Sequence, residues 1–320
     1  MSRVESDVTR ILVAGCGAIG SVFACLLSER GHRLTVLGRG PHLDALARDG
    51  IEIRGIWGEH RSSAIEATSE ISHLASDYDA VLIACKSYQT DDLLAGLGDR
   101  ARPDGIAISL QNGLGNVERA ARVYGPGRVL AGRVIFGAEI ESPGIVAVTV
   151  EAEPVLFGVP GARADARAAR WAAIVAEAGI RCAPCDDIDA ALWAKVLYNA
   201  ALNPLGALLG LRYGELAADA ERRRIMDRVI DEAFRVARAE GVDLPWSDCA
   251  GYLEAFYGRL VPATADHRSS MLQDIERGRP TEIDAICGEV CRRGDRHGID
   301  VATNRLLAML VRARLPASGG

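Results

Sequence analysis

A short glycine-rich turn near the start of the chain constrains the fold more than any other feature of the sequence. It follows an apolar, β-rich run at residues 11–14 and opens a helical pattern at residues 18–30. In such a strand–turn–helix unit, the first glycine permits the tight turn, the second lets the backbone approach a pyrophosphate, and the third lets the helix pack on the strand. The helix N-terminus offers unpaired N–H groups to phosphate oxygens. The turn is therefore predicted to bind a dinucleotide, through Gly15, Cys16, Gly17, Ala18, Ile19 and Gly20.

Strand and helix patterns alternate through the first half of the chain. Further β-rich runs lie at residues 34–37, 80–85, 106–110, 129–135, 146–150 and 155–157. This alternation is typical of an α/β fold of Rossmann type with a doubly wound parallel sheet. After residue 186 the patterns are helical only. The 320 residues are enough for two domains. We expect a Rossmann-like domain over residues 1–185 and an all-α domain over residues 186–320.

Composition excludes several classes of partner and site. The 37 basic and 43 acidic residues give a net charge of −6, and the basic ones are scattered, so neither nucleic acid nor an anionic membrane surface is an expected partner. No apolar run of about 18 residues predicts a membrane span, and no signal peptide pattern is present. Eight cysteines without a leader fit a cytoplasmic protein with reduced thiols. Cys182 and Cys185 form a C-x-x-C pair without a second pair at zinc-ribbon spacing, so no metal site is expected.

The end of the second predicted strand indicates which dinucleotide binds. NAD enzymes usually carry an acidic residue about 20 positions after the glycines, where it hydrogen-bonds the ribose 2′-hydroxyl. Here the strand ends in Gly38 and Arg39, without a carboxylate. A guanidinium can bind a 2′-phosphate through paired hydrogen bonds. Arg39 therefore favours NADP over NAD, and an ordinary solvated arginine is the alternative interpretation.

Lysine is almost absent from the chain. Of the 37 basic residues only Lys86 and Lys195 are lysines, and the other 35 are arginines. A lysine can exchange a proton near neutral pH when burial lowers its pKa, which an arginine does not do. The two lysines are therefore candidates for a functional site.

Lys195 belongs to a polar strip in an otherwise apolar helical segment. Lys195, Asn199 and Asn203 are spaced by four residues, which places them on one face of a helix. One interpretation is a core helix whose polar face meets water. The favoured one is a face that binds a small polar substrate, because buried polar groups need partners. Glu282, in the first turn of a later helix, is explained equally well by the helix dipole and by a functional role.

Taken together, the motifs resemble those of the ketopantoate reductase family. The resemblance covers nearly the whole chain, and the order and spacing of its segments are more specific than any one of them. Family members have the two-domain architecture inferred above, use NADPH and reduce a 2-oxo acid to a 2-hydroxy acid. The matching segments are the glycine turn, residues 86–90, residues 111–113, residues 195–204 and residues 269–284.

The resemblance implies roles for residues of the helical half. It identifies Lys195 as the general acid that protonates the alkoxide when hydride reaches the carbonyl carbon. It implies that Asn199 and Asn203 bind the substrate through their amides, and that Ser270 contacts the substrate carboxylate. An ammonium group suits the first role, because hydride addition builds negative charge on the carbonyl oxygen.

The resemblance also implies four contacts to the cofactor. Asn112 is expected to bridge the nicotinamide ribose and the substrate, and Lys86 to contact the cofactor. Glu282 is expected either to contact the cofactor or to order the lysine. The backbone of Gly137, in a loop after the strand at residues 129–135, is expected to contact the cofactor as well.

Two positions depart from the family pattern. Tyr213 and His267 stand where the family often has asparagine, at positions that tend to meet the hydroxyl end of the substrate. The predicted function is NADPH-dependent reduction of a small 2-oxo acid, first of all 2-dehydropantoate to pantoate. The alternatives are a paralogue that reduces a different 2-oxo or 3-oxo acid, and an NADP-binding sensor without turnover. A homodimer through the helical domain is a further hypothesis.

Overall fold

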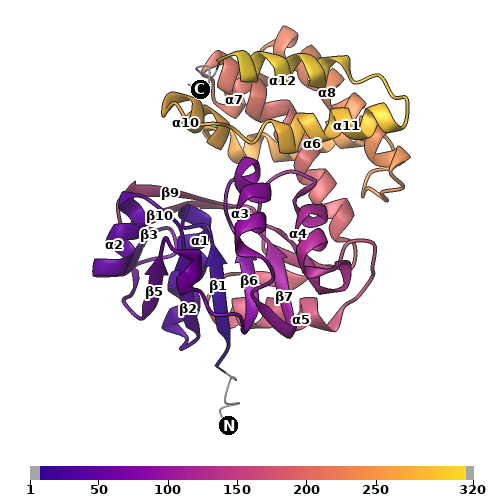
Figure 1. Cartoon of the computed structure of the whole chain (residues 1–320). Coiled ribbons are helices and arrows are strands. Elements are labelled where there is room, and N and C mark those ends of the chain that lie inside the picture. The colour runs from indigo at the N-terminus through magenta and orange to yellow at the C-terminus, as the bar shows by residue number, and fades with distance from the viewer. Residues whose placement is uncertain (1–7, 315–320) are drawn as a thin grey trace, which may run out of the picture. The chain divides into compact units, whose positions relative to one another are not determined.

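The computed structural model describes residues 8–314, which divide into two compact units (Figure 1). The first comprises Met1–Gln111 and Asn116–Ile188, and the second Asn112–Gly115 and Asp189–Gly320, as far as these residues are described. The second unit thus begins three residues after the boundary expected from the sequence. It also includes a four-residue segment, residues 112–115, that follows a strand of the first unit in the chain.

The first unit is built on an eight-stranded sheet whose strands run parallel except for one antiparallel pair, β8 with β11. The sheet order is β12-β11-β8-β7-β6-β1-β2-β5. Its strands are β1 (Arg10–Ala14), β2 (Arg33–Leu37), β5 (Ile65–Thr68), β6 (Tyr78–Ile83), β7 (Ala101–Ser109), β8 (Val129–Arg133), β11 (Val155–Gly158) and β12 (Cys182–Pro184). Its helices are α1 (Ala18–Glu29), α2 (Pro41–Asp49), α3 (Thr90–Leu97), α4 (Asn116–Tyr124) and α5 (Ala166–Glu177).

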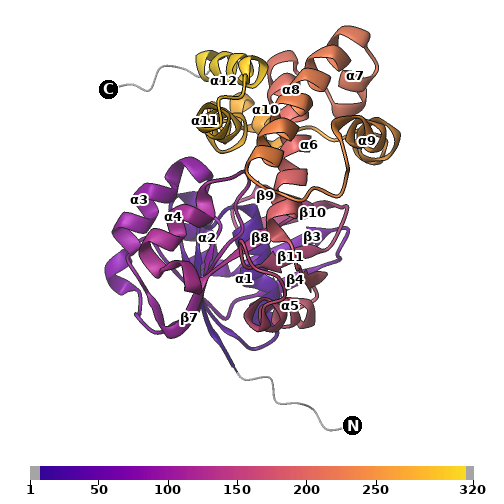
Figure 2. The same ribbon diagram turned by 90° about the vertical axis from the view of Figure 1, so that its right-hand side faces the viewer.

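Helices cover both faces of this sheet, because its central strands are apolar on both sides. In β1, Ile11 and Val13 pack into the core under α1 and α5, while Leu12 and Ala14 pack into the core under α3 and α4. This alternation follows from the two-residue period of a strand. Figure 2 shows α3 and α4 on one side of the sheet and α1 and α5 on the other. The predicted Rossmann-type fold is confirmed.

A second, four-stranded sheet was not expected from the sequence. Its order is β4-β3-β10-β9, with β3 (Ile51–Gly55), β4 (His60–Ser62), β9 (Phe136–Ser142) and β10 (Ile145–Glu151). The run at residues 146–150 was predicted as one more strand of the parallel sheet, which is wrong. It pairs antiparallel with β9 and parallel with β3. Helix α1 is apolar on most of its surface and packs against both sheets, for example through Phe23 on Phe136, 6.2 Å between ring centroids.

A buried histidine joins this second sheet to α1 and makes stability depend on pH. The Gly144 N–H donates to His42 Nδ1 over 3.0 Å, and His42 Nε2 lies 2.9 Å from the Ser21 hydroxyl. The imidazole that accepts from Gly144 must be neutral at Nδ1. Burial lowers the pKa of His42, and also that of His32. Both histidines therefore bind protons more readily in the unfolded chain, and they contribute stability that is lost as pH falls below about 6.5.

We expect His42→Gln to flatten this pH dependence. The glutamine removes one group that must stay neutral in the fold, so the melting temperature should fall less between pH 7 and pH 5 than in the wild type. Thermal melts followed by circular dichroism at several pH values measure this. His73→Gln, at an exposed histidine, is the matched control and should keep the wild-type slope. An unchanged slope in His42→Gln would remove His42 from this account.

The second unit is helical, and no strand is found in its described part, residues 112–115 and 189–314. Its long central helix α6 (Ile188–Leu209) runs through Pro204, and most of its apolar side chains are buried in the core of the unit. Among residues 8–314 no helix is both long and apolar enough to span a membrane. The other helices are α7 (Tyr213–Ala217), α8 (Ala220–Ala239), α9 (Cys249–Ala255), α10 (Ser270–Glu276), α11 (Glu289–Arg296) and α12 (Ala302–Arg314), with π-helical turns at Phe256–Leu260 and Asp284–Gly288.

Candidate functional site

The glycine turn lies at the carboxyl end of β1, where the strand order of the sheet reverses. The chain proceeds from β1 to β2 on one side, and the next strand of the sheet, β6, lies on the other side. Parallel α/β sheets bind their ligands at the carboxyl edge at such a point. The turn is fixed there because the Gly15 N–H donates to the Leu37 carbonyl at the end of β2, over 2.9 Å.

Each glycine of the turn meets a different steric requirement. Gly15 has φ +121°, and a Cβ there would lie 2.4 Å from the backbone nitrogen of Cys85. A Cβ at Gly20 would lie 2.1 Å from the Gly15 carbonyl oxygen. Gly17 has open space around its Cα and is the N-cap of α1 without a side-chain cap. No side chain therefore caps the first N–H groups of α1, and Gly17 has no side chain that would block access to them. A dinucleotide phosphate can accept hydrogen bonds from these N–H groups.

Two basic residues lie near the same edge of the sheet. Arg39 is exposed two residues after β2, and Lys86 is half-buried three residues after β6. The chain at Gly38 packs against the turn, since a Cβ at Gly38 would lie 2.1 Å from Cys16 Sγ. Burial raises the pKa of the Cys16 thiol, so this cysteine stays protonated in the turn. Arg39 and Lys86 thus follow the two strands that flank β1.

The expected loop at Gly137 is not present. Gly137 lies within β9, paired with Val150 of β10, next to a register shift between Val148 and Val150. The sequence pattern predicts a loop after a strand at residues 129–135, but β8 ends at Arg133 and β9 already begins at Phe136. Gly137 is therefore a residue of the small sheet, and only its backbone is available for a ligand.

The helical unit holds a chain of hydrogen bonds that connects three of the predicted residues. Lys195 Nζ donates to Asn112 Oδ1 over 2.5 Å, and Asn112 Nδ2 donates to Glu282 Oε2 over 3.2 Å. Lys195 is half-buried on α6, and Glu282 is buried just before the π-helical turn at Asp284–Gly288. An ammonium, an amide and a carboxylate thereby form one hydrogen-bonded line, in this order, although the three residues are far apart in the sequence.

Asn112 reaches this line because its loop is anchored to the helical unit. The Leu114 N–H donates to the Ala285 carbonyl over 2.8 Å. Gly113 has φ +82°, and a Cβ there would lie 2.3 Å from the same carbonyl oxygen. The π-helical turn contains Ala285, and such turns recur at functional sites. The Gln111-Asn112-Gly113 motif therefore needs its glycine for a close backbone approach.

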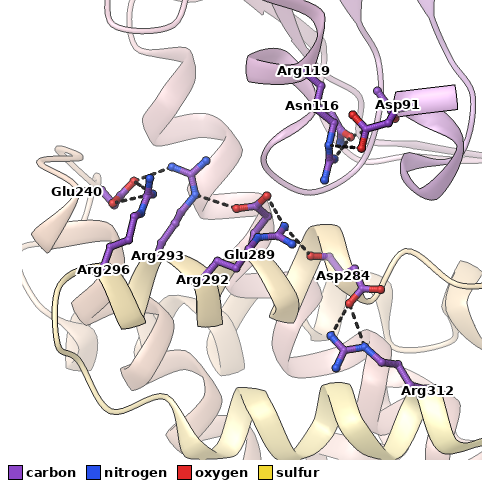
Figure 3. Close-up of polar contacts among 11 residues, drawn as sticks. Asp91, Asn116, Arg119, Glu240, Asp284, Glu289, Arg292, Arg293, Arg296 and Arg312 are labelled. Atoms are coloured by element: carbon purple, nitrogen blue, oxygen red, sulfur yellow. Dashed lines mark hydrogen bonds and ion pairs between the residues drawn. The ribbon is translucent and has the colours of Figure 1, made fainter. Parts of the chain in front are cut away.

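A network of ion pairs surrounds Glu289, the residue that lies beside the 112–115 loop (Figure 3). A Cβ at Gly115 would lie 2.2 Å from Glu289 Oε1, so the loop passes directly over that carboxylate. Glu289 pairs with Arg292 and with Arg293, and Arg293 pairs in turn with Glu240 over 2.6 Å. Although burial acts to raise it, hydrogen bonds from His297 and Arg293 hold the pKa of Glu240 below its ordinary value. The network fixes the start of α11 beneath the loop.

Two asparagines continue the line of Lys195 along α6. Asn199 and Asn203 have side chains that are 8% and 5% exposed. Within residues 8–314 neither amide nitrogen has a hydrogen-bond partner. Neither nitrogen is among the fully buried polar atoms that lack a partner in this part of the chain, so both reach accessible space, where a polar ligand could pair with them. The polar strip predicted from the spacing is therefore present on α6.

The start of α10 is joined to this strip by a serine for which the sequence predicts a helix start and no further role. Ser269 is the N-cap of α10, accepts from the Leu272 N–H, and donates its hydroxyl to the Asn203 carbonyl over 3.5 Å. Ser270, the predicted carboxylate contact, follows it in the first turn and is exposed. A serine before a helical run is a common N-cap signal, so the local sequence predicts Ser269 at the helix start, which is confirmed, but not its contact with α6.

Comparison with known proteins gives one consistent result. A family model described as ketopantoate reductase PanE/ApbA matches residues 11–160, and the model of its C-terminal part matches residues 187–315. The 2-dehydropantoate 2-reductase of Aquifex aeolicus is 34% identical over 308 residues, which is 96% of this chain and 97% of the relative.

Solved structures agree with this match. The PanE/ApbA family ketopantoate reductase from Ralstonia eutropha JMP134 has a TM-score of 0.84 at 30% identity, covering 95% of this chain and 98% of that one. D-mandelate dehydrogenase, solved with NADH and anilino(oxo)acetate, has a TM-score of 0.86 at 24% identity, with coverage of 95% and 98%. The latter similarity shows a shared fold.

Proposed function

The chain belongs to the ketopantoate reductase family, and on this premise we propose that it reduces a small 2-oxo acid to a 2-hydroxy acid with NADPH. Its relatives are named 2-dehydropantoate 2-reductases, so it is an oxidoreductase that acts on CH–OH groups. 2-Dehydropantoate, reduced to pantoate, is the first candidate substrate. The resemblance inferred from the sequence motifs is thereby confirmed at the level of the family.

The observation that carries the proposal is the hydrogen-bonded line of Lys195, Asn112 and Glu282. It presents one ammonium group whose position is fixed by an amide, and that amide is fixed by a buried carboxylate. On the same helix follow Asn199 and Asn203, whose side-chain nitrogens have no hydrogen-bond partner among the described residues. A cationic proton donor beside amide donors suits a small anion with a reactive carbonyl.

The residues of this unit would act on the carbonyl oxygen. Bound NADPH supplies the hydride. As hydride adds to the carbonyl carbon, negative charge develops on the oxygen, and the Lys195 ammonium stabilises that charge and donates a proton to form the hydroxyl. The neutral amine regains its proton from solvent. Asn112 Oδ1 holds the ammonium in place, and Glu282 orients the Asn112 amide so that Oδ1 faces the lysine.

The residues of the first unit fit a dinucleotide with a 2′-phosphate. The backbone around Gly17 is open toward phosphate oxygens, and no acidic side chain occupies the first turn of α1. At the end of β2 the exposed Arg39 stands where NAD-binding proteins usually have a carboxylate. These features support NADPH, with Arg39 as the residue that distinguishes it from NADH.

We expect Arg39→Asp to reverse the cofactor preference. An aspartate repels the 2′-phosphate and accepts from a free 2′-hydroxyl, so the ratio of kcat/KM with NADPH to that with NADH should fall by about tenfold or more. Steady-state oxidation of each cofactor measures the ratio. Arg170→Asp, at an exposed arginine of α5, makes the same charge change elsewhere and should leave the ratio unchanged. If Arg39→Asp also leaves it unchanged, the 2′-phosphate is bound by other residues.

A panel of 2-oxo acids tests the proposed function as a whole. NADPH consumption is followed with 2-dehydropantoate and with straight-chain, branched and aromatic 2-oxo acids, together with 3-oxo acids, and the products are identified by mass spectrometry. Reduction of 2-dehydropantoate above the rest supports the first candidate. Reduction of another 2-oxo or 3-oxo acid instead would identify a paralogue, in line with Tyr213 and His267. Binding of NADPH without turnover of any acid would contradict the proposal.

A further inference from the structure

A buried tyrosine fixes the orientation of the last amide in the polar strip of α6, that of Asn203. The Tyr213 hydroxyl donates to Asn203 Oδ1 over 2.6 Å, and the two side chains are only 3% and 5% exposed. This bond uses the acceptor side of the Asn203 amide. The donor side, Nδ2, has no hydrogen-bond partner in the part of the chain that the structure describes. Asn203 is thereby left with N–H groups to offer.

The surroundings of Tyr213 hold this arrangement in place. The Tyr213 ring contacts Tyr198 edge-on at 5.7 Å between centroids and His267 at 5.1 Å. The Tyr213 N–H donates to the His267 carbonyl, and the Gly214 N–H donates to the Ala265 carbonyl over 2.8 Å. A ring enclosed in this way has little rotational freedom, and burial raises the pKa of Tyr213 so that its hydroxyl keeps its proton. The amide of Asn203 is therefore held in one of its two orientations.

The position of Asn203 on α6 indicates which end of a substrate it meets. It lies eight residues after Lys195, two turns further along the same face of the helix. Lys195 is assigned to the reacting carbonyl, and Asn199 lies between the two. Asn203 therefore meets the end of the substrate that is distant from the reacting carbonyl.

We infer that Tyr213 is a positioning residue that fixes Asn203 as a hydrogen-bond donor, and that this donor selects 2-oxo acids with an acceptor oxygen at their distal end. The inference rests on the proposed function. A hydroxyl, carbonyl or carboxylate oxygen satisfies the Asn203 N–H groups, and a hydrocarbon end would shield them from water without pairing with them. Sites built to hydrogen-bond a substrate hydroxyl reject the analogue without it strongly.

A pair of substrates that differ by one hydroxyl tests the inference in the wild type. 2-Dehydropantoate and 3,3-dimethyl-2-oxobutanoate share their carbon skeleton, and the second lacks the distal hydroxyl. We expect kcat/KM to favour the hydroxylated acid by about tenfold or more. Equal values, or a preference for the deoxy acid, would overturn the inference while leaving 2-oxo acid reduction intact. If neither these two nor any other 2-oxo acid is reduced, the proposed function fails and the inference fails with it.

Tyr213→Phe then isolates the contribution of the hydroxyl. Without its donor, the Asn203 amide can rotate, so KM for 2-dehydropantoate should rise about tenfold while kcat stays within about twofold. The values for the deoxy acid should change little, and the preference between the two acids should largely disappear. Tyr257→Phe is the matched control, because it removes a tyrosine hydroxyl bonded to Asp227 over 2.7 Å on the same unit. It should keep the wild-type preference.

A double-mutant cycle shows whether Tyr213 acts through Asn203. In an Asn203→Ala background, Tyr213→Phe should cause no further rise in KM for 2-dehydropantoate. An additive rise, or equal losses with both acids in Tyr213→Phe, would show that the tyrosine only stabilises the fold, and would overturn the inference.

Discussion

Lys195→Met is expected to lower kcat for 2-oxo acid reduction by roughly 10³-fold and to leave the Kd for NADPH within about threefold of the wild type. Methionine keeps the length and apolar stem of the half-buried lysine but removes the ammonium, so neither charge stabilisation nor proton donation remains. The Asn112 Oδ1 that accepts from Nζ over 2.5 Å also loses its donor. Steady-state rates at saturating NADPH and a separate fluorescence titration of the cofactor measure the two quantities.

The other lysine of the chain supplies the control for this prediction. Lys86→Met makes the same change beside the carboxyl edge of the sheet, where a cofactor contact is proposed. It should raise KM for NADPH while kcat at saturation stays within about threefold. A loss of less than about tenfold in Lys195→Met would remove that residue as the proton donor.

Gly17→Val is expected to abolish most of the affinity for NADPH without unfolding the chain. No atom lies within 4 Å of a Cβ at this position, and the backbone is extended with φ −72°, so the fold accepts a side chain there. The valine would instead occupy the space where phosphate oxygens approach the first turn of α1. We expect Kd for NADPH to rise by roughly 100-fold, measured by calorimetry, with a melting temperature close to that of the wild type.

Gly127→Val shows whether the effect belongs to the turn. Gly127 lies in the 3-10 turn Pro126–Arg128, and a Cβ there also meets open space. Its affinity for NADPH should equal that of the wild type. Normal NADPH binding by Gly17→Val would place the dinucleotide away from the glycine turn.

Much of the fold was predictable because its signals are local. The glycine turn follows a strand and precedes a helix, and the apolar runs of the parallel strands are continuous because both sheet faces are covered. The spacing of Lys195, Asn199 and Asn203 placed three polar groups on one helix face, as observed. In each case a short stretch of sequence contains the whole pattern.

The remaining features depend on contacts between distant segments. Strand β10 has an ordinary apolar pattern, and nothing in that pattern says that it pairs with β3 and β9 instead of the parallel sheet. The pattern around Gly137 likewise does not show that β9 pairs with β10, so a loop was predicted there. The segment 112–115 lies with the helical unit because a π-helical carbonyl accepts from Leu114. The hydroxyl of Tyr213 reaches Asn203 because a turn after α6 brings α7 back beside it.

Transfer of deuterium from NADPH to the substrate tests the central claim most directly. The wild-type protein is incubated with a 2-oxo acid and with NADPH that carries deuterium at both hydrogen positions of the nicotinamide C4, and the product is analysed by mass spectrometry and NMR. We predict a 2-hydroxy acid with deuterium on the former carbonyl carbon, formed at least about 10³-fold more slowly by Lys195→Met. A product without deuterium at that carbon, or an equal rate of labelling by Lys195→Met, would contradict the account.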